Sequence, residues 1–179
     1  TGHSEPRLGR VTVPPPLGAS VVEGKFDLVC LGELLVDMFP AEIGRELAAV
    51  SFFRPTPGGA PANVAVAAAR LGMRVAFVGR VGDEPFGRRL VQVLRKEGVD
   101  TRGVRFDPCA RTTMAFIAQP DPERYEIVFY RNPGADMLLS PEDLDRDLLL
   151  SARGFHFGSV SLTHDPSRES AIEALNVVR

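Results

Sequence analysis

The sequence predicts an α/β fold in which a parallel sheet is flanked by helices. Residues 26–32 and 73–79 are continuous apolar runs, typical of strands buried on both faces. A glycine turn and an apolar helix lie between them, which is the order of a βαβ unit with parallel strands. A third run of this kind, residues 154–161, extends the same pattern.

The composition favours one globular domain with a proper core. Of the 179 residues 44% are hydrophobic, and no apolar run reaches the roughly 18 residues of a membrane span. A net charge of −2 without a long basic run argues against nucleic acid or a membrane as a partner. Cys30 and Cys109 form neither a metal-binding spacing nor a disulfide framework, so we expect no metal site and a cytoplasmic protein.

Residues 1–24 have no hydrophobic period and include three consecutive prolines, so they are interpreted as a disordered leader. The sequence has no initiating Met, and Arg7 and Arg10 are the basic residues of this leader. A remnant of a longer precursor, such as a transit segment to a plastid, is the alternative interpretation. The folded domain is expected to occupy residues 25–179.

The chain is organised around the turn at residues 57–63. Gly58 and Gly59 remove the Cβ atoms that would keep a ligand away from the backbone, and Pro61 suits the first turn of a helix. Free N–H groups at this helix start and the amide of Asn63 fit a polyhydroxyl or anionic ligand. The alternative is a glycine turn that merely precedes a core helix.

Two carboxylates follow the first strand. Glu33 and Asp37 lie where this strand should emerge from the sheet, and open α/β sheets bind ligands at the carboxyl ends of their strands. The alternative for each carboxylate is a solvated or capping role.

After the second strand, the sequence predicts a helix that ends at Gly98. Asp83 is expected to cap its start and Glu84 to lie on the surface. Its apolar stripe consists of Phe86, Leu90, Val93 and Leu94.

A hairpin interrupts the parallel plan. Residues 112–119 and 125–130 are strand-like runs joined by a polar loop, and we place the inserted β strands at about 104–131. A small hairpin must pack on another element, so we expect a lid over the ligand crevice or a dimer contact. Arg131 follows it and either reaches into the crevice as a multiple donor or pairs with Asp136.

The last third of the chain predicts two helices around the third strand. Residues 140–143 form a capping box for a helix through Leu150, and Asp165 with Pro166 caps a final helix. Ser159, at the polar end of the third strand, should return to the crevice.

Three ordered motifs resemble the N-terminal signatures of the pfkB/ribokinase family of carbohydrate kinases: residues 32–37, 58–65 and 81–87. Residues 129–139 and 155–162 are similar to plant-type fructokinases, in which the loop usually has Ser at the position of Gly134. The resemblance covers residue 26 to the end.

This resemblance implies a Rossmann-like ribokinase fold with an inserted β lid, which in this family often forms a homodimer contact. The implied reaction is phosphorylation of D-fructose to fructose 6-phosphate by ATP with Mg²⁺. Asp37 would accept hydrogen bonds from sugar hydroxyls, Gly58 and Gly59 would let the sugar lie against the backbone, and Asn63 would hold further hydroxyls.

The same resemblance gives roles to the lid and the floor. Phe116 and Phe129 would form an apolar cover, Arg131 would contact the sugar from the lid side, and Ser159 would line the floor of the pocket.

The chain departs from the family in one respect. The Gly-Ala-Gly-Asp segment, whose Asp is the family's general base, and the ATP site do not occur in these 179 residues. Phosphoryl transfer depends on such positioned groups, so the C-terminal half is expected to be missing and this portion to be inactive alone. No catalytic residue is therefore assigned.

Two alternatives stay open. One is another pfkB sugar or nucleoside kinase, and the other is a non-catalytic, fructokinase-like scaffold or regulatory protein. A dinucleotide-binding oxidoreductase is disfavoured because the first strand is not followed by Gly-x-Gly-x-x-Gly.

Overall fold

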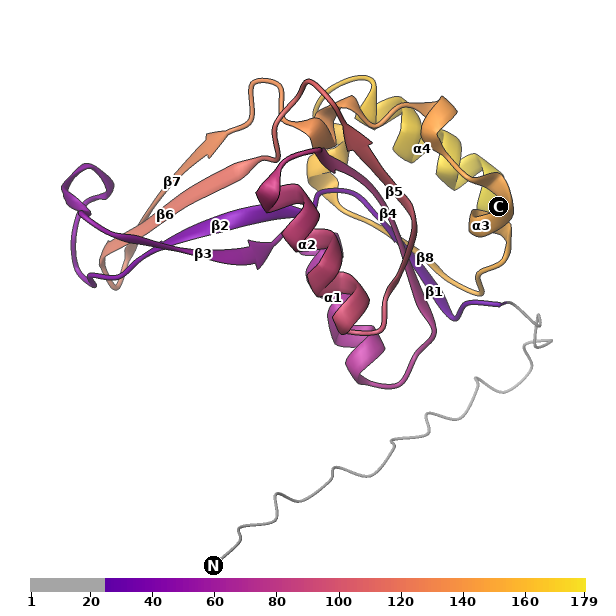
Figure 1. The fold of residues 1–179 in the computed structure, drawn as a ribbon, viewed down its shortest axis with the longest axis horizontal. Coiled ribbons are helices and arrows are strands. Elements are labelled where there is room, and N and C mark those ends of the chain that lie inside the picture. Colours follow the sequence, from indigo (N-terminus) through magenta and orange to yellow (C-terminus); the bar gives the residue numbers. More distant parts are fainter. Residues whose placement is uncertain (1–24) are drawn as a thin grey trace, which may run out of the picture.

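The computed structural model describes residues 25–179, so the leader expected at residues 1–24 lies outside the described part. Two four-stranded sheets form, and the second projects from one end of the first (Figure 1). The first sheet is parallel throughout, with the order β5-β4-β1-β8. Its strands are β1 (Leu28–Leu31), β4 (Val75–Gly82), β5 (Asp100–Asp107) and β8 (Phe155–Phe157). The predicted α/β fold with a parallel sheet is confirmed.

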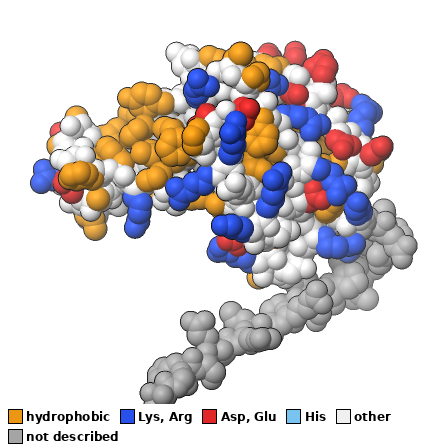
Figure 2. Space-filling model, in the orientation of Figure 1, with side chains coloured by type: hydrophobic (Ala, Val, Ile, Leu, Met, Phe, Trp, Pro, Cys, Tyr) orange, Lys and Arg blue, Asp and Glu red, His pale blue; other side chains and the backbone are white. Residues whose placement is uncertain are grey.

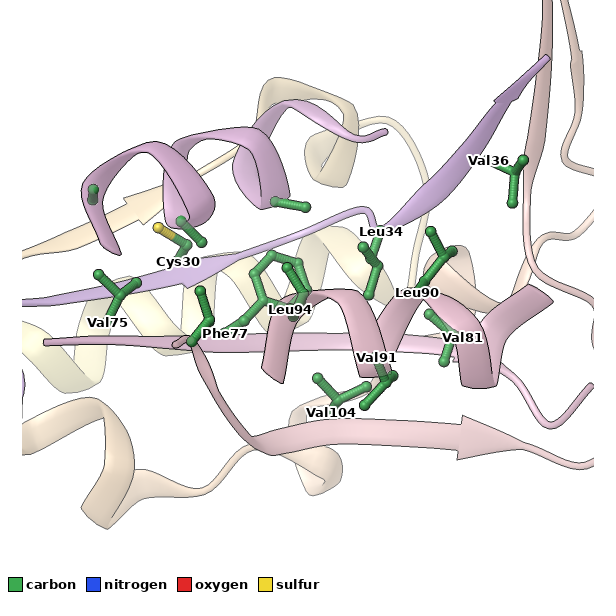
Figure 3. Close-up of a cluster of buried hydrophobic side chains, with 14 residues drawn as sticks. Cys30, Leu34, Val36, Val75, Phe77, Val81, Leu90, Val91, Leu94 and Val104 are labelled. Atoms are coloured by element: carbon green, nitrogen blue, oxygen red, sulfur yellow. The ribbon is translucent and has the colours of Figure 1, made fainter. Parts of the chain in front are cut away.

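Helices cover both faces of the first sheet. On one face α1 (Ala60–Arg70) and α2 (Pro85–Lys96) pack on alternate strand residues such as Cys30 and Phe77 (Figure 3). On the other face α3 (Arg146–Leu150) and α4 (Ser167–Val178) pack on their neighbours in the strands, which include Val29, Leu31, Ala76 and Val78. Both faces of β1 and β4 are therefore buried, which explains their unbroken apolar sequences. Burial also raises the pKa of the Cys30 thiol to about 12.

The second sheet has the order β3-β2-β6-β7. It consists of β2 (Leu35–Pro40), β3 (Phe53–Gly58), β6 (Met114–Asp121) and β7 (Arg124–Tyr130). The predicted hairpin is present as the antiparallel pair β6 and β7. The expectation that inserted strands begin at about residue 104 was wrong, because β5 pairs in parallel with β4 in the first sheet. Two further strands, β2 and β3, were not predicted.

The cap of α2 differs from the prediction. The Glu84 carboxylate accepts hydrogen bonds from the N–H groups of Gly87 at 2.9 Å and Phe86 at 3.1 Å, and it also accepts the Thr112 hydroxyl. Asp83 instead forms an exposed ion pair with Arg88 at 2.8 Å. Glu84 is the better placed acceptor because it directly precedes the helix, so the choice of Asp83 as the cap was wrong.

The predicted capping box of Ser140 and Asp143 is present, but the helix expected to run from it to Leu150 is interrupted, and the predicted cap of the last helix by Asp165 was wrong. Ser140 donates its N–H to Asp143 at 3.0 Å, but the turn that they begin ends after three residues, and Asp145 starts α3 separately. The Asp143 carboxylate also forms an ion pair with Nη1 of Arg80 at 2.8 Å. Asp165 pairs with Arg168 at 2.7 Å and gives no side-chain cap to α4.

In residues 25–179, no helix combines the length and the apolar character needed to cross a membrane.

Candidate functional site

The glycine turn lies directly against the Glu33 backbone and the Asp37 side chain. Gly58 ends β3, and Gly59 precedes α1 with a φ of +105°. A Cβ atom on Gly59 would lie 2.3 Å from the carbonyl oxygen of Glu33, and one on Gly58 would lie 2.1 Å from Oδ2 of Asp37. At Gly59 both the positive φ and the Glu33 backbone exclude a side chain, whereas at Gly58 a side chain would displace the Asp37 carboxylate.

Asp37 lies in the middle of β2, at the seam between the two sheets. It is paired with Thr56 in β3 and with Ala115 in β6, and its side chain lies against Gly58. The residue is half-buried, and burial raises the pKa of its carboxyl group. This carboxylate is therefore held at the glycine turn with its capacity to accept hydrogen bonds available.

Strand pairing decides which lid residues share a face with Asp37. Paired residues point to the same face of a sheet, and successive residues alternate. Asp37 pairs with Ala115, and Ala115 pairs with Phe129, so Phe129 shares the face of Asp37. Phe116 pairs with Met38 and points to the opposite face, where its ring contacts those of Phe53 and Tyr130. Phe116 and Phe129, which were expected to form one apolar cover, therefore lie on opposite faces of the second sheet.

Glu33 is a buried carboxylate, which the sequence predicted at the ligand-binding end of the first strand or in a solvated or capping role. Its side chain reaches the start of α1, where Oε1 accepts the N–H of Ala60 at 3.0 Å. Oε2 is buried without a hydrogen-bond partner among residues 25–179, and a Cβ atom on Gly158 would lie 2.9 Å from it. Burial is the main cause that raises the pKa of Glu33, and the negative charge of Asp136 adds to it.

Arg131 is held in a buried ion pair at the base of the hairpin. Its Nε and Nη2 atoms both lie 2.7 Å from Oδ2 of Asp136. The other oxygen of Asp136, Oδ1, accepts a hydrogen bond from the Thr113 hydroxyl. The structure thus shows the pairing with Asp136 that the sequence offered as the alternative. Charge and shape hold the guanidinium in place at the junction of the hairpin and the first sheet.

Asn63 and Ser159 are the two predicted polar contacts that face solvent. Asn63 lies in the first turn of α1 and lines a surface hollow with Pro57 and residues of α2. Ser159 directly follows Gly158, whose Cα is packed against Glu33 and Pro61. The structure therefore brings Asp37, Gly58, Gly59 and the segment before Ser159 around one turn, with Asn63 at its outer side.

Comparison with known protein families assigns this chain to one family. The model of the pfkB family carbohydrate kinases matches residues 25–179. The chain belongs to the pfkB family of carbohydrate kinases. A probable fructokinase-2 of Arabidopsis thaliana is 48% identical over 152 residues, and a fructokinase of Solanum tuberosum is 48% identical over 153 residues. Each alignment covers 85% of this chain.

Solved structures of pfkB-type sugar kinases share the fold. The fructokinase of Halothermothrix orenii superposes with a TM-score of 0.78 at 36% identity, covering 86% of this chain and 53% of that one. A sugar kinase of Pyrococcus horikoshii, solved in complex with ATP, gives 0.79 at 37% identity, covering 83% of this chain and 48% of that one. The ribokinase-type fold implied by the sequence is thereby confirmed.

The chain spans about half the length of the curated relatives that it matches. The alignments cover 46% of the Arabidopsis protein and 48% of the Solanum tuberosum protein. One further relative, 46% identical, is described as a chloroplastic probable fructokinase of Arabidopsis thaliana.

Replacement of Gly59 by Ala should destabilise the fold far more than the same change at Gly98. Both glycines have positive φ, but a Cβ atom on Gly98 meets nothing within 4 Å. Gly98→Ala should cost about 1 kcal/mol through conformation alone. Gly59→Ala adds overlap with the Glu33 backbone and should cost at least about 2 kcal/mol more. Urea unfolding of the complete protein measures both, and equal losses would show that the close contact at Gly59 is absent.

Replacement of Asp37 by Asn should raise the stability of the fold at neutral pH. The pKa of Asp37 is raised in the folded state, so its ionised form opposes folding above that pKa. The stabilisation should shrink as the pH falls through the folded pKa and vanish below the unfolded value of about 4, where parent and variant are both neutral. Thermal unfolding at several pH values measures this. A variant that is less stable at neutral pH would contradict the assignment of an unpaired, desolvated carboxylate.

Proposed function

We propose that the complete protein is a fructokinase, which transfers a phosphoryl group from ATP to D-fructose and yields fructose 6-phosphate. The observation that carries this proposal is the Asp37 carboxylate held against Gly58 in the glycine turn. It occurs in a chain that is 48% identical to proteins named as fructokinases.

The chemistry of this turn suits a neutral sugar. Desolvation raises the pKa of the half-buried Asp37 carboxyl group, so its ionised form is stabilised when ligand hydroxyls donate hydrogen bonds to it. In this proposal the sugar also lies against the backbone of Gly58 and Gly59. In this proposal Asp37 accepts sugar hydroxyls, Asn63 and Ser159 bind others, and Arg131, oriented by Asp136, donates from the lid side.

Phe129 is the apolar part of the proposed cover. It shares the sheet face of Asp37 and is 53% exposed, so it has surface to lay against a sugar. The hairpin also exposes other large apolar side chains along the edge strand β7, among them Tyr125 and Ile127. Figure 2 shows hydrophobic side chains gathered over this projecting sheet. We propose that the same hairpin forms a homodimer contact.

We propose that ATP and Mg²⁺, which the reaction requires, bind outside residues 25–179. Within residues 25–179, no group of three or more His, Cys, Asp or Glu side chains is arranged to hold a metal ion. Near the glycine turn the chain offers carboxylates, and Arg131 is neutralised by Asp136, so it supplies little positive charge for a transferring phosphoryl group. We propose that these residues bind and orient the sugar, and that the ATP site and the general base lie in another part of the complete protein.

For the compartment, we propose the cytoplasm, with the plastid as the alternative that the chloroplastic relative supports.

The complete protein should phosphorylate D-fructose with ATP, and Asp37→Ala should lower kcat/KM for fructose by about 100-fold, the effect of losing hydrogen bonds to a charged group. The KM for ATP should stay nearly unchanged, because the ATP site lies elsewhere. A coupled assay of ADP release measures both quantities.

Glu123→Gln is the matched control for that assay. Glu123 is an exposed carboxylate in the turn of the hairpin, so its loss changes the net charge equally and should leave the kinetics unaltered. Equal kcat/KM for Asp37→Ala and the parent would remove Asp37 from the sugar site.

A further inference from the structure

The partly buried charges around the glycine turn are mostly negative. Three consecutive residues of the turn touch acidic side chains or their backbone: Gly58 lies against Asp37, Gly59 against the Glu33 backbone, and Ala60 donates to the Glu33 carboxylate. Asp136 is close enough to add its charge to Glu33. The side chains of Glu33 and Asp136 are almost wholly buried, so water screens them weakly.

The buried arginine beside these carboxylates, Arg131, is already paired with an acidic side chain. Arg131 is bound to Asp136 through two of its nitrogen atoms at 2.7 Å. Arg54 shares the sheet face of Asp37, since it pairs with Phe39, but it is exposed and lies two residues beyond Thr56, toward the tip of the second sheet. An anionic group beside Asp37 would therefore find no desolvated guanidinium free to neutralise it.

The first two residues of α1 offer no free N–H group to an anion. Helix N-termini usually attract anions through their free N–H groups. Here the first of these groups, on Ala60, is bound by Glu33 at 3.0 Å, and Pro61 has no N–H to offer. The protein's own carboxylate thus occupies the place that a ligand carboxylate or phosphate would take.

We propose that the Asp37 carboxylate is a specificity-determining group, which makes the site accept neutral polyhydroxyl sugars and reject sugar acids of the same shape. The proposal rests on the proposed sugar-kinase function and deepens it. Hydroxyl groups donate hydrogen bonds to Asp37, whereas a ligand carboxylate placed beside Asp37 meets a like charge that disfavours binding.

The test compares two acceptors that differ at one carbon. D-Fructose and 2-keto-D-gluconate share the ketone and all other hydroxyls, but the second carries a carboxylate in place of the C1 hydroxymethyl group. The ratio of kcat/KM for fructose to that for the acid is measured on the complete protein, for the parent and for Asp37→Asn. The parent should favour fructose by at least about 100-fold, and Asp37→Asn should lower the ratio by at least about tenfold.

Asn retains the size of the side chain and a hydrogen-bonding oxygen, so the change isolates the charge. Asp37→Ser removes the same charge with a smaller side chain and serves as the second variant if Asp37→Asn does not fold. Glu123→Gln removes an exposed charge of the hairpin turn and should leave the ratio unchanged.

The outcomes distinguish the proposed fructokinase function from the proposed role of Asp37 in selectivity. If the parent does not phosphorylate fructose, the proposed function fails. If the parent does so and the variants keep its ratio, the function stands and Asp37 does not set selectivity by charge. A ratio that falls equally in Glu123→Gln would assign the effect to net charge and would also overturn the inference.

Discussion

The structure depends on one close contact, in which the backbone of Gly58 and Gly59 lies directly on the segment that joins β1 to β2. Glu33 contributes both its carbonyl oxygen and its carboxylate to this contact, and Asp37 contributes its side chain. The contact ties the first sheet, the second sheet and the start of α1 together. Because any Cβ atom would separate them, the geometry of the site and the junction of the two sheets are set by the same atoms.

This arrangement places two carboxylates where their ionised forms are desolvated by the fold. Burial raises the pKa values of both Glu33 and Asp37, which means that each resists ionisation in the folded protein. Glu33 recovers part of the cost through the N–H of Ala60, but Asp37 has no comparable support. Groups held at such a cost are typical of functional sites, because a ligand can supply the missing hydrogen bonds.

The sequence predicted β1, β4 and β8 of the first sheet, the glycine turn and the hairpin, because each has a local signal in apolar runs or in turn residues. It did not predict β3, since Pro55 and Pro57 weaken any strand pattern and are tolerated here at a sheet edge. The facing of Phe116 was missed because it depends on the register between β2 and β6, which no local pattern records. The partner of Arg131 was named only as an alternative, since a short sequence separation does not decide between an ion pair and a ligand contact.

The central claim is that the turn at Gly58 and Gly59, with Asp37, is the place where a sugar binds. A crystal structure of the complete protein with D-fructose tests it most directly. The account predicts a sugar hydroxyl within about 3 Å of an Asp37 oxygen, with the sugar ring against the two glycines. Fructose bound away from this turn, with Asp37 contacting only protein or water, would contradict the account.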